Sequence, residues 1–155
     1  MPVINPTTGK EFDSVPEASQ NDLNQAIMAA KQAFPAWRDL PWEEKQKCFL
    51  KFADAVEAKK EEFATALTNE QGKPLASAMG EVSSVIGKAR MFGTMEQPLL
   101  PKTTHEDDSA RFESHHLPRG VVGGIAPWNF PLSIGAGKAM NAAVMGNTVV
   151  VKPSP

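Results

Sequence analysis

Apolar residues recur at three- and four-residue steps through the first 95 positions, which is the spacing of amphipathic helices. Residues 5–9 form a predicted turn between two short extended pieces. A first helix is predicted from Ser19, where Ser19 and Asp22 have the spacing of a capping box. Pro35 should end this helix because proline has no amide proton, and a second helix should begin near Pro41. Two further helices complete a mainly helical region over residues 1–95.

The apolar stripes of these helices are expected to face a core, covering either a sheet or one another. Gly72 should end the third helix in the left-handed conformation, and the fourth should stop near Gly93. Charged residues of the second helix, such as Lys45, should face water. The expected core positions are Leu23, Ala26, Ile27, Ala30, Ala33 and Phe34, then Phe49, Phe52, Ala53 and Val56, then Phe63, Ala66 and Leu67, and finally Leu75, Ala78, Met79, Val82, Ile86 and Ala89.

Residues 96–118 break the helical pattern. Pro98 and Pro101 bracket a predicted linker, and residues 103–109 are polar and acidic. Residues 109–117 alternate weakly between apolar and polar side chains, which predicts a half-exposed antiparallel strand.

The last segment, residues 119–155, has the pattern of one βαβ unit. Val121–Ile125 is a short apolar strand, a helix should run from Pro131 to about Met145, and Val149–Val151 is a second, β-branched strand. Two strands joined by a helical crossover should be parallel. The fold class is therefore α/β, and since two parallel strands do not make a stable sheet, we expect the amino-terminal part of a larger protein.

Composition narrows the function classes. The chain has 155 residues, of which 41% are hydrophobic and 22% charged, as in ordinary soluble proteins. A net charge of -2 argues against a nucleic-acid partner, and no apolar run approaches the roughly 18 residues of a membrane span. The lone Cys48 excludes an intrachain disulfide, and the acidic start favours a cytoplasmic location. Residues 118–155 contain no carboxylate and carry a net charge of +3, which suits an anionic ligand.

Two side chains are candidates for chemistry. In open α/β sheets, ligands bind beyond the carboxyl ends of parallel strands, so Asn129 and Lys152 should lie at one edge. Lys152 could donate to a sugar hydroxyl or phosphate oxygen, and the Asn129 amide could stabilise charge developing on an oxygen. Alternatively, Asn129 satisfies the turn backbone and Lys152 is a solvated strand end. Spacing alone favours neither interpretation.

Three other features do not predict a site. The glycines at 135 and 137 match neither a phosphate loop nor a dinucleotide fingerprint, and they are expected to bring the helix close to the sheet. His115 and His116 are adjacent in a predicted strand, so they should face opposite ways and bind no common metal ion. Cys48 is expected to be a partly buried helix residue rather than a nucleophile.

The segment Gly120–Pro131, with Lys138 and with residues 146–154, closely resembles the NAD(P)-dependent aldehyde dehydrogenase superfamily. The resemblance covers essentially the whole chain. Three earlier segments resemble that family's amino-terminal landmarks in the same order: Asn5–Lys10, Ala33–Trp37 and Glu70–Leu75.

The resemblance implies a helical region followed by the first βαβ unit of an incomplete Rossmann-like cofactor domain. It also implies oxidation of a small-molecule aldehyde to a carboxylic acid by NAD or NADP, through a cysteine thiohemiacetal. Asn129 matches the asparagine that holds the thiohemiacetal oxyanion, and Lys138 matches a lysine sometimes given a charge-relay role. The residues that match the family's cofactor-binding segment are Ile125, Ala126, Pro127, Trp128, Lys152, Ser154 and Pro155.

Pro155 stands where the family often has a ribose-binding glutamate, so NADP is tolerable and no strict preference for NAD is expected. The family's nucleophilic cysteine and general base belong to later sequence, so the chain alone is expected to be inactive. Full-length members are expected to be homo-oligomers, as dimers or tetramers. The alternative is a non-catalytic short module that joins a full-length dehydrogenase subunit through the strand at 109–117.

Overall fold

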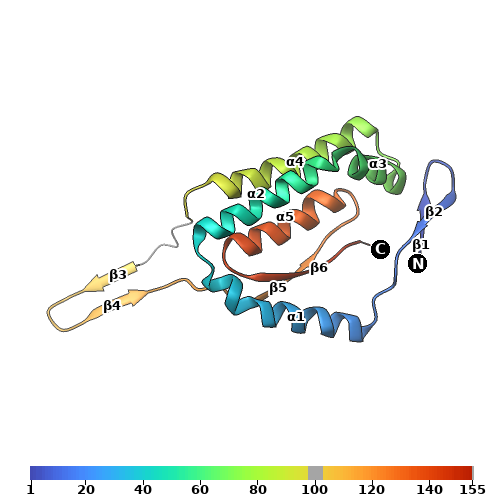
Figure 1. Cartoon of the computed structure of the whole chain (residues 1–155). Helices are drawn as coiled ribbons and strands as arrows, with labels where there is room; N and C mark the ends of the chain where they lie inside the picture. Colours follow the sequence, from blue (N-terminus) through green and yellow to red (C-terminus); the bar gives the residue numbers. More distant parts are fainter. Residues whose placement is uncertain (98–102, 155) are drawn as a thin grey trace.

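The computed structural model describes residues 1–97 and 103–154, so Pro98, Pro101 and Pro155 lie outside the described residues. A run of consecutive helices stands between two hairpins along the chain, and a further helix joins the two strands of the last sheet, as Figure 1 shows. The elements are β1 (Pro2–Asn5), β2 (Lys10–Ser14), α1 (Gln20–Asp39), α2 (Trp42–Ala58), α3 (Lys60–Gln71), α4 (Leu75–Thr94), β3 (Thr103–Glu106), β4 (Arg111–Ser114), β5 (Val121–Ile125), α5 (Pro131–Val144) and β6 (Thr148–Lys152).

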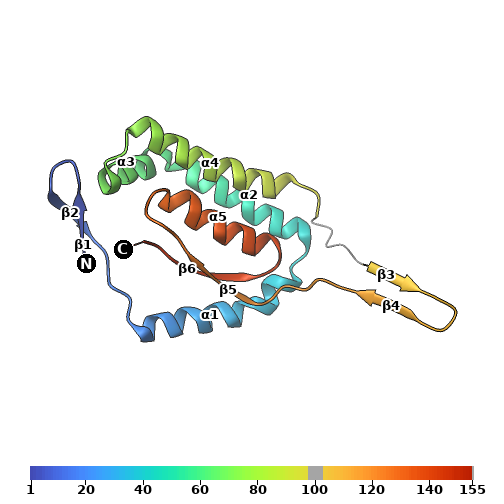
Figure 2. The same ribbon diagram turned by 180° about the vertical axis from the view of Figure 1, so that it is seen from behind.

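The β5–β6 sheet lies between helices. Helix α5 packs against one face of β5 and β6 and contacts α4 on its outer side, and α2 packs on α4 in turn. Helix α1 contacts the same two strands from the opposite side, as Figures 1 and 2 show. The sequence left open whether the helices cover a sheet or one another. Both occur, because α1 and α5 cover the sheet and α2 and α4 cover one another.

The predicted βαβ unit is confirmed. Strands β5 and β6 pair in parallel, from Val121 opposite Thr148 to Ile125 opposite Lys152. Helix α5 begins at Pro131, as expected of proline in a first helical turn. Asn147 anchors the connection to β6, since its side-chain oxygen accepts a hydrogen bond of 3.1 Å from the Gly120 amide.

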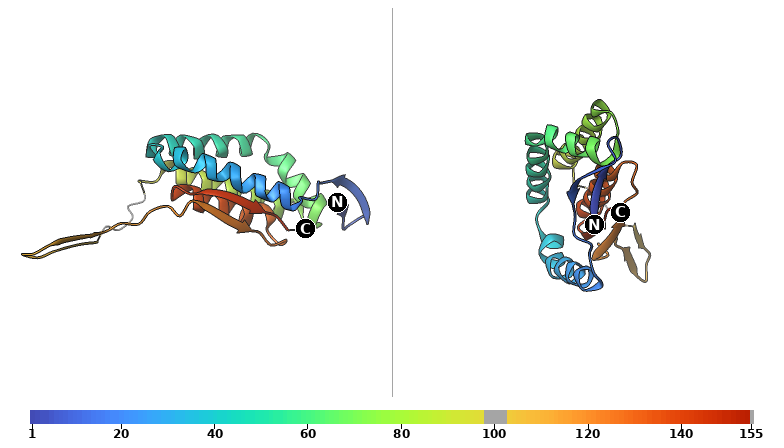
Figure 3. Two further views of the ribbon diagram at one scale, coloured as in Figure 1. Left: turned by 90° about the horizontal axis from the view of Figure 1, so that it is seen from below. Right: turned by 90° about the vertical axis from the view of Figure 1, so that its right-hand side faces the viewer.

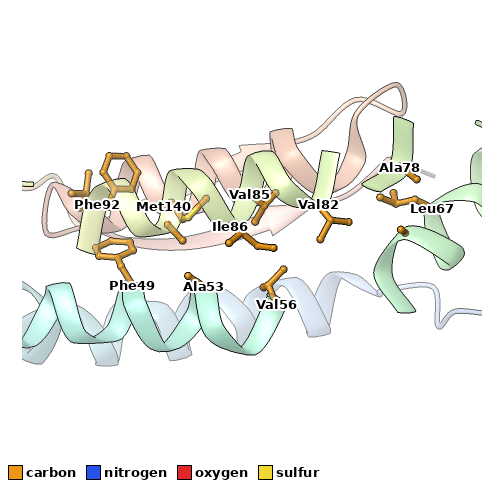
Figure 4. Close-up of a cluster of buried hydrophobic side chains, with 13 residues drawn as sticks. Phe49, Ala53, Val56, Leu67, Ala78, Val82, Val85, Ile86, Phe92 and Met140 are labelled. Atoms are coloured by element: carbon orange, nitrogen blue, oxygen red, sulfur yellow. The ribbon is translucent and has the colours of Figure 1, made fainter. Parts of the chain in front are cut away.

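The hydrophobic core lies between α2, α3, α4 and α5 (Figure 4). Most expected core positions of α2, α3 and α4 are buried, among them Phe49 and Val82. Three expected core positions of α2, α3 and α4 are instead exposed, namely Phe52, Ala66 and Leu75.

Helix α1 differs from its prediction in length and in burial. It continues through Pro35 to Asp39, because its last turn is anchored by Trp37, whose indole N–H donates to the Ala143 carbonyl at 2.9 Å. No residue of α1 is buried, and Leu23 and Ile27 remain exposed because α1 covers only two strands.

The capping box at the start of α1 is confirmed. Ser19 accepts a hydrogen bond from the Asp22 amide, and the Asp22 carboxylate accepts one from the Ser19 amide. Hydrogen bonds from Ser19 lower the pKa of Asp22 below its usual value, because they favour the charged carboxylate.

Lys45 was expected to face water, and the structure corrects this. The side chain is buried, with its ammonium 2.9 Å from the Arg38 carbonyl and 5.9 Å from the centre of the Trp37 ring. Burial lowers the pKa of Lys45 because desolvation disfavours the ammonium, while the negative charge of Asp39 acts in the opposite direction. The Arg38 carbonyl at the carboxyl end of α1 thus gives the buried ammonium a hydrogen-bond acceptor.

The two hairpins lie outside the core. Strands β1 and β2 pair across the predicted turn. Strand β4 is shorter than the predicted strand at 109–117, and all its residues are exposed. Its partner is β3, which lies in the segment interpreted as polar linker. The β3–β4 hairpin extends away from the helices in Figures 1 and 3, so no core patterning marked β3 as a strand.

Gly93 is required for close packing of α4 on α2. A Cβ atom at this position would lie 2.6 Å from two carbon atoms of Leu50. We therefore expect Gly93→Ala to lower the free energy of unfolding by about 1–3 kcal/mol, as overpacking does. Gly87→Ala is the matched control on the same helix, because nothing lies near its Cβ position and alanine favours the helix. Urea denaturation of both variants checks this, and equal stability would contradict it.

Candidate active site

The carboxyl ends of β5 and β6 meet at one edge of the sheet. Ile125 and Lys152 are partners in the parallel register, and the Ala126 amide donates to the Lys152 carbonyl at 3.0 Å. The turn from Ala126 to Phe130 continues from this edge into α5, and it contains Asn129. The topology thus brings the turn of Asn129 and the end of β6 to the same edge, as the sequence predicted.

Side chains alternate between the two faces of this edge. Gly124 faces α5, because a Cβ atom there would lie 3.4 Å from the Cβ of Lys138. Ile125 and Lys152 therefore face the opposite side of the sheet. The stem of Lys138 packs over β5 on the α5 face, so Lys138 and Lys152 occupy different faces.

The Asn129 side chain is exposed, and its amide makes no hydrogen bond to any other residue in the described part of the chain. Its backbone carbonyl is 3.4 Å from the Lys73 ammonium. The amide is therefore available to an external oxygen. The Lys152 ammonium lies 2.8 Å from the Pro153 carbonyl and is exposed, so it too retains free donors.

Apolar groups beside these donors are open to solvent. Ile125 and Trp128 are 74% and 73% exposed. Ala126 is buried, Pro127 is exposed and Ser154 is half-buried. An exposed apolar surface therefore lies next to ammonium and amide donors at this edge of the sheet.

Three residues that support the Asn129 turn were missed by the sequence analysis. The Gln71 side chain donates to the Trp128 carbonyl, Lys73 reaches the Asn129 carbonyl, and Glu81 accepts from the first turn of α5. One signal was present in the sequence. Glu81 stands directly before Val82 and three residues after Ala78 on the buried stripe of α4, where a carboxylate must find partners.

The other candidates remain outside this site. Cys48 is exposed on α2 rather than partly buried, although it directly precedes the buried Phe49. The two glycines of α5 do allow close packing, since a Cβ at Gly135 would meet Ala126 and Val151 at 3.8 Å. Within residues 1–97 and 103–154, no cluster of histidine, cysteine and carboxylate side chains could hold a metal ion. None of the helices described is long and apolar enough to cross a membrane.

Comparison with known proteins extends this picture. The aldehyde dehydrogenase family profile matches residues 1–155. The chain is 33% identical over 151 residues to the D-glyceraldehyde dehydrogenase (NADP(+)) of Picrophilus torridus, covering 97% of this chain and 31% of that protein. It is 36% identical over 156 residues to a human mitochondrial methylmalonate-semialdehyde/malonate-semialdehyde dehydrogenase, covering 98% of this chain and 29% of that protein.

A solved structure agrees with the sequence matches. The crystal structure of an Escherichia coli NADP-dependent enzyme superposes with a TM-score of 0.90 at 34% identity, covering 99% of this chain and 32% of that one. The chain thus spans about a third of the length of the proteins it matches. Because sequence and fold agree along its whole length, this chain belongs to the aldehyde dehydrogenase family.

Proposed function

We propose that this chain forms part of an enzyme that oxidises an aldehyde with NAD or NADP, supplying an oxyanion donor and part of the cofactor site. The single observation that carries this proposal is the position of the Asn129 amide. This amide has no hydrogen-bond partner in the described chain. The turn that carries it begins at the edge of the sheet where the side chains of Ile125 and Lys152 share one face.

The role proposed for Asn129 follows from its chemistry. When a cysteine thiolate adds to an aldehyde, the carbonyl oxygen acquires negative charge. A neutral amide N–H fixed at the right distance stabilises that charge without titrating. The cysteine comes from outside residues 1–155 in this proposal, because Cys48 lies on α2, which packs on α4 and α3 rather than on the β5–β6 sheet.

The cofactor role rests on the face that carries Ile125 and Lys152. Bound NAD(P)+ supplies the hydride acceptor, and this chain's part is to hold its nucleotide. Lys152 offers charged donors to the ribose of the nucleotide. Ile125 and Trp128 offer apolar surface to the flat base of the nucleotide. Ala126 and Pro127 shape the strand end, and Ser154 follows β6 on the same edge. Both NAD and NADP remain in the proposal, and two of the proteins compared carry NADP in their names.

Lys138 has weaker support. Its stem packs against Gly124 on the α5 face of the sheet, opposite to the face of Lys152. This position favours a role in holding α5 on β5, and the charge-relay role implied by the family resemblance stays a prediction.

Assembly and location are also proposals. The β3–β4 hairpin has exposed strands and an exposed Phe112, which favours strand addition to a partner. We propose that it joins copies in a homo-oligomer, and the same feature would serve a non-catalytic module bound to a full-length subunit. The cytoplasmic location stays a prediction, since the human relative is mitochondrial.

Absorbance at 340 nm tests the proposed division of roles. A full-length protein that carries this segment should form NAD(P)H when an aldehyde is added. The isolated 155-residue chain should give a flat trace with the same aldehyde. Turnover by the isolated chain that disappears in Cys48→Ala would contradict the proposal, because the nucleophile would then lie within it.

A further inference from the structure

Glu81 is a carboxylate enclosed in the protein core. Its side chain is 1% exposed, although it lies on the apolar stripe of α4. One carboxylate oxygen accepts hydrogen bonds of 3.0 Å from the backbone amides of both Leu132 and Ser133. These amides belong to the first turn of α5, which has no side-chain cap and no acidic residue of its own. Glu81 therefore supplies from α4 the negative group that the start of α5 lacks.

Lys73 connects this carboxylate to the turn before α5. Its ammonium lies 2.5 Å from the second oxygen of Glu81, and its side chain is only 15% exposed. The same ammonium lies 3.4 Å from the Asn129 carbonyl and 4.9 Å from the centre of the Phe130 ring. The pair thus holds the chain at the Asn129 carbonyl and at the first turn of α5 that follows it.

Packing of α4 on α5 alone does not require an ion pair at this place. Burying a carboxylate and an ammonium is unfavourable unless further hydrogen bonds compensate, and apolar side chains would fill the same space at least as well. Here the compensating groups are backbone atoms of Asn129, Leu132 and Ser133. The side-chain amide of Asn129 has no partner in the described chain, so only its backbone fixes its position.

We propose that Lys73 and Glu81 are positioning residues, which fix the backbone at Asn129 and in the first turn of α5 so that the Asn129 side-chain amide meets the oxyanion. This inference rests on the proposed function, because it assumes that Asn129 is the oxyanion donor. A displacement of about 1 Å at such a donor can lower a rate roughly a hundredfold, so rigid support of this turn has a direct catalytic consequence.

Hydrogen exchange and kinetics of Glu81→Ala and Glu81→Gln test this in a full-length protein that carries the segment. In Glu81→Ala, the amides of peptide 128–134 should exchange roughly tenfold to a hundredfold faster, as expected for lost hydrogen bonds to a charged group. The rate constant kcat should fall by a similar factor while the KM for the cofactor stays constant. Glu81→Gln keeps an acceptor for the two amides and should fall in between.

A double-mutant cycle separates positioning from simple stability. In the background of Asn129→Ala, adding Glu81→Ala should change kcat less than roughly twofold, since there is no amide left to position. An equal loss of kcat with or without Asn129 would overturn the proposal. Glu57→Ala is the matched control, because it breaks the exposed ion pair with Arg90 and should change neither readout.

The two levels of the proposal fail in different ways. If Asn129→Ala alone leaves kcat unchanged, the proposed function is wrong at this residue. If Glu81→Ala leaves exchange in peptide 128–134 unchanged, the support by Lys73 and Glu81 is wrong, whatever the activity. Glu81→Gln provides the same readouts should the alanine variant unfold.

Discussion

Replacing Asn129 with alanine is expected to lower the rate of the chemical step by roughly tenfold to a thousandfold, which is the scale of losing one oxyanion donor. The effect should be large because the amide lies in a turn held at fixed backbone positions, between β5 and the first turn of α5. Water in its place would have to reorganise as the charge develops, whereas the amide is already oriented.

Single-turnover formation of NAD(P)H by a full-length protein that carries this segment measures this step. Asn141→Ala is the matched control, since Asn141 is also exposed but lies within α5. The control should keep the rate of the unmodified protein. A rate for Asn129→Ala equal to that of the control would remove Asn129 from the mechanism.

Replacing Phe49 with alanine is expected to lower the free energy of unfolding by about 3–5 kcal/mol, the range for removing a buried aromatic ring. Phe49 is 5% exposed, and its ring centre lies 5.5 Å from that of Phe92 and 6.4 Å from that of Trp37. The residue therefore joins α1, α2 and α4, and its removal leaves a cavity that none of these helices can close alone.

Phe52→Ala on the same helix is the control, because Phe52 is 39% exposed and should lose much less. Urea denaturation followed by circular dichroism compares the two variants. Similar losses for both would contradict the placement of Phe49 in the core between α2, α3, α4 and α5.

The helices and the βαβ unit could be predicted because their apolar residues follow regular periods. The spacing of the apolar residues could not reveal which other element packs against each apolar face, or whether any does. Leu23 and Ile27 have the right spacing for a core, but α1 covers only two strands and leaves them exposed. Pro35 lacks a helix donor, yet the contacts of Trp37 keep the last turn helical. Strand β3 has no apolar face, so only its pairing with β4 identifies it.

The edge that unites Asn129 with the end of β6 could be predicted because parallel strands end on the same side of a sheet. Its support could not be predicted. Glu81 and the amides of α5 are about fifty residues apart in sequence, and only the packing of α4 on α5 brings them together. The burial of Lys45 was missed for the same reason, since the Arg38 carbonyl and the Trp37 ring reach it only once α1 and α2 fold together.

The most direct test of this account separates kcat from the KM for the cofactor at the shared edge of β5 and β6. In a full-length protein that carries this segment, Lys152→Ala should raise the KM for NAD(P)+ roughly tenfold to a hundredfold, the range for losing a hydrogen bond from a charged group, with kcat nearly constant. Asn129→Ala should lower kcat roughly tenfold to a thousandfold and leave the KM for NAD(P)+ nearly constant. Lys51→Ala, on the exposed side of α2, should change neither constant. If Lys152→Ala and Asn129→Ala both behaved like Lys51→Ala, this edge of the sheet would not be the site of cofactor binding and oxyanion stabilisation.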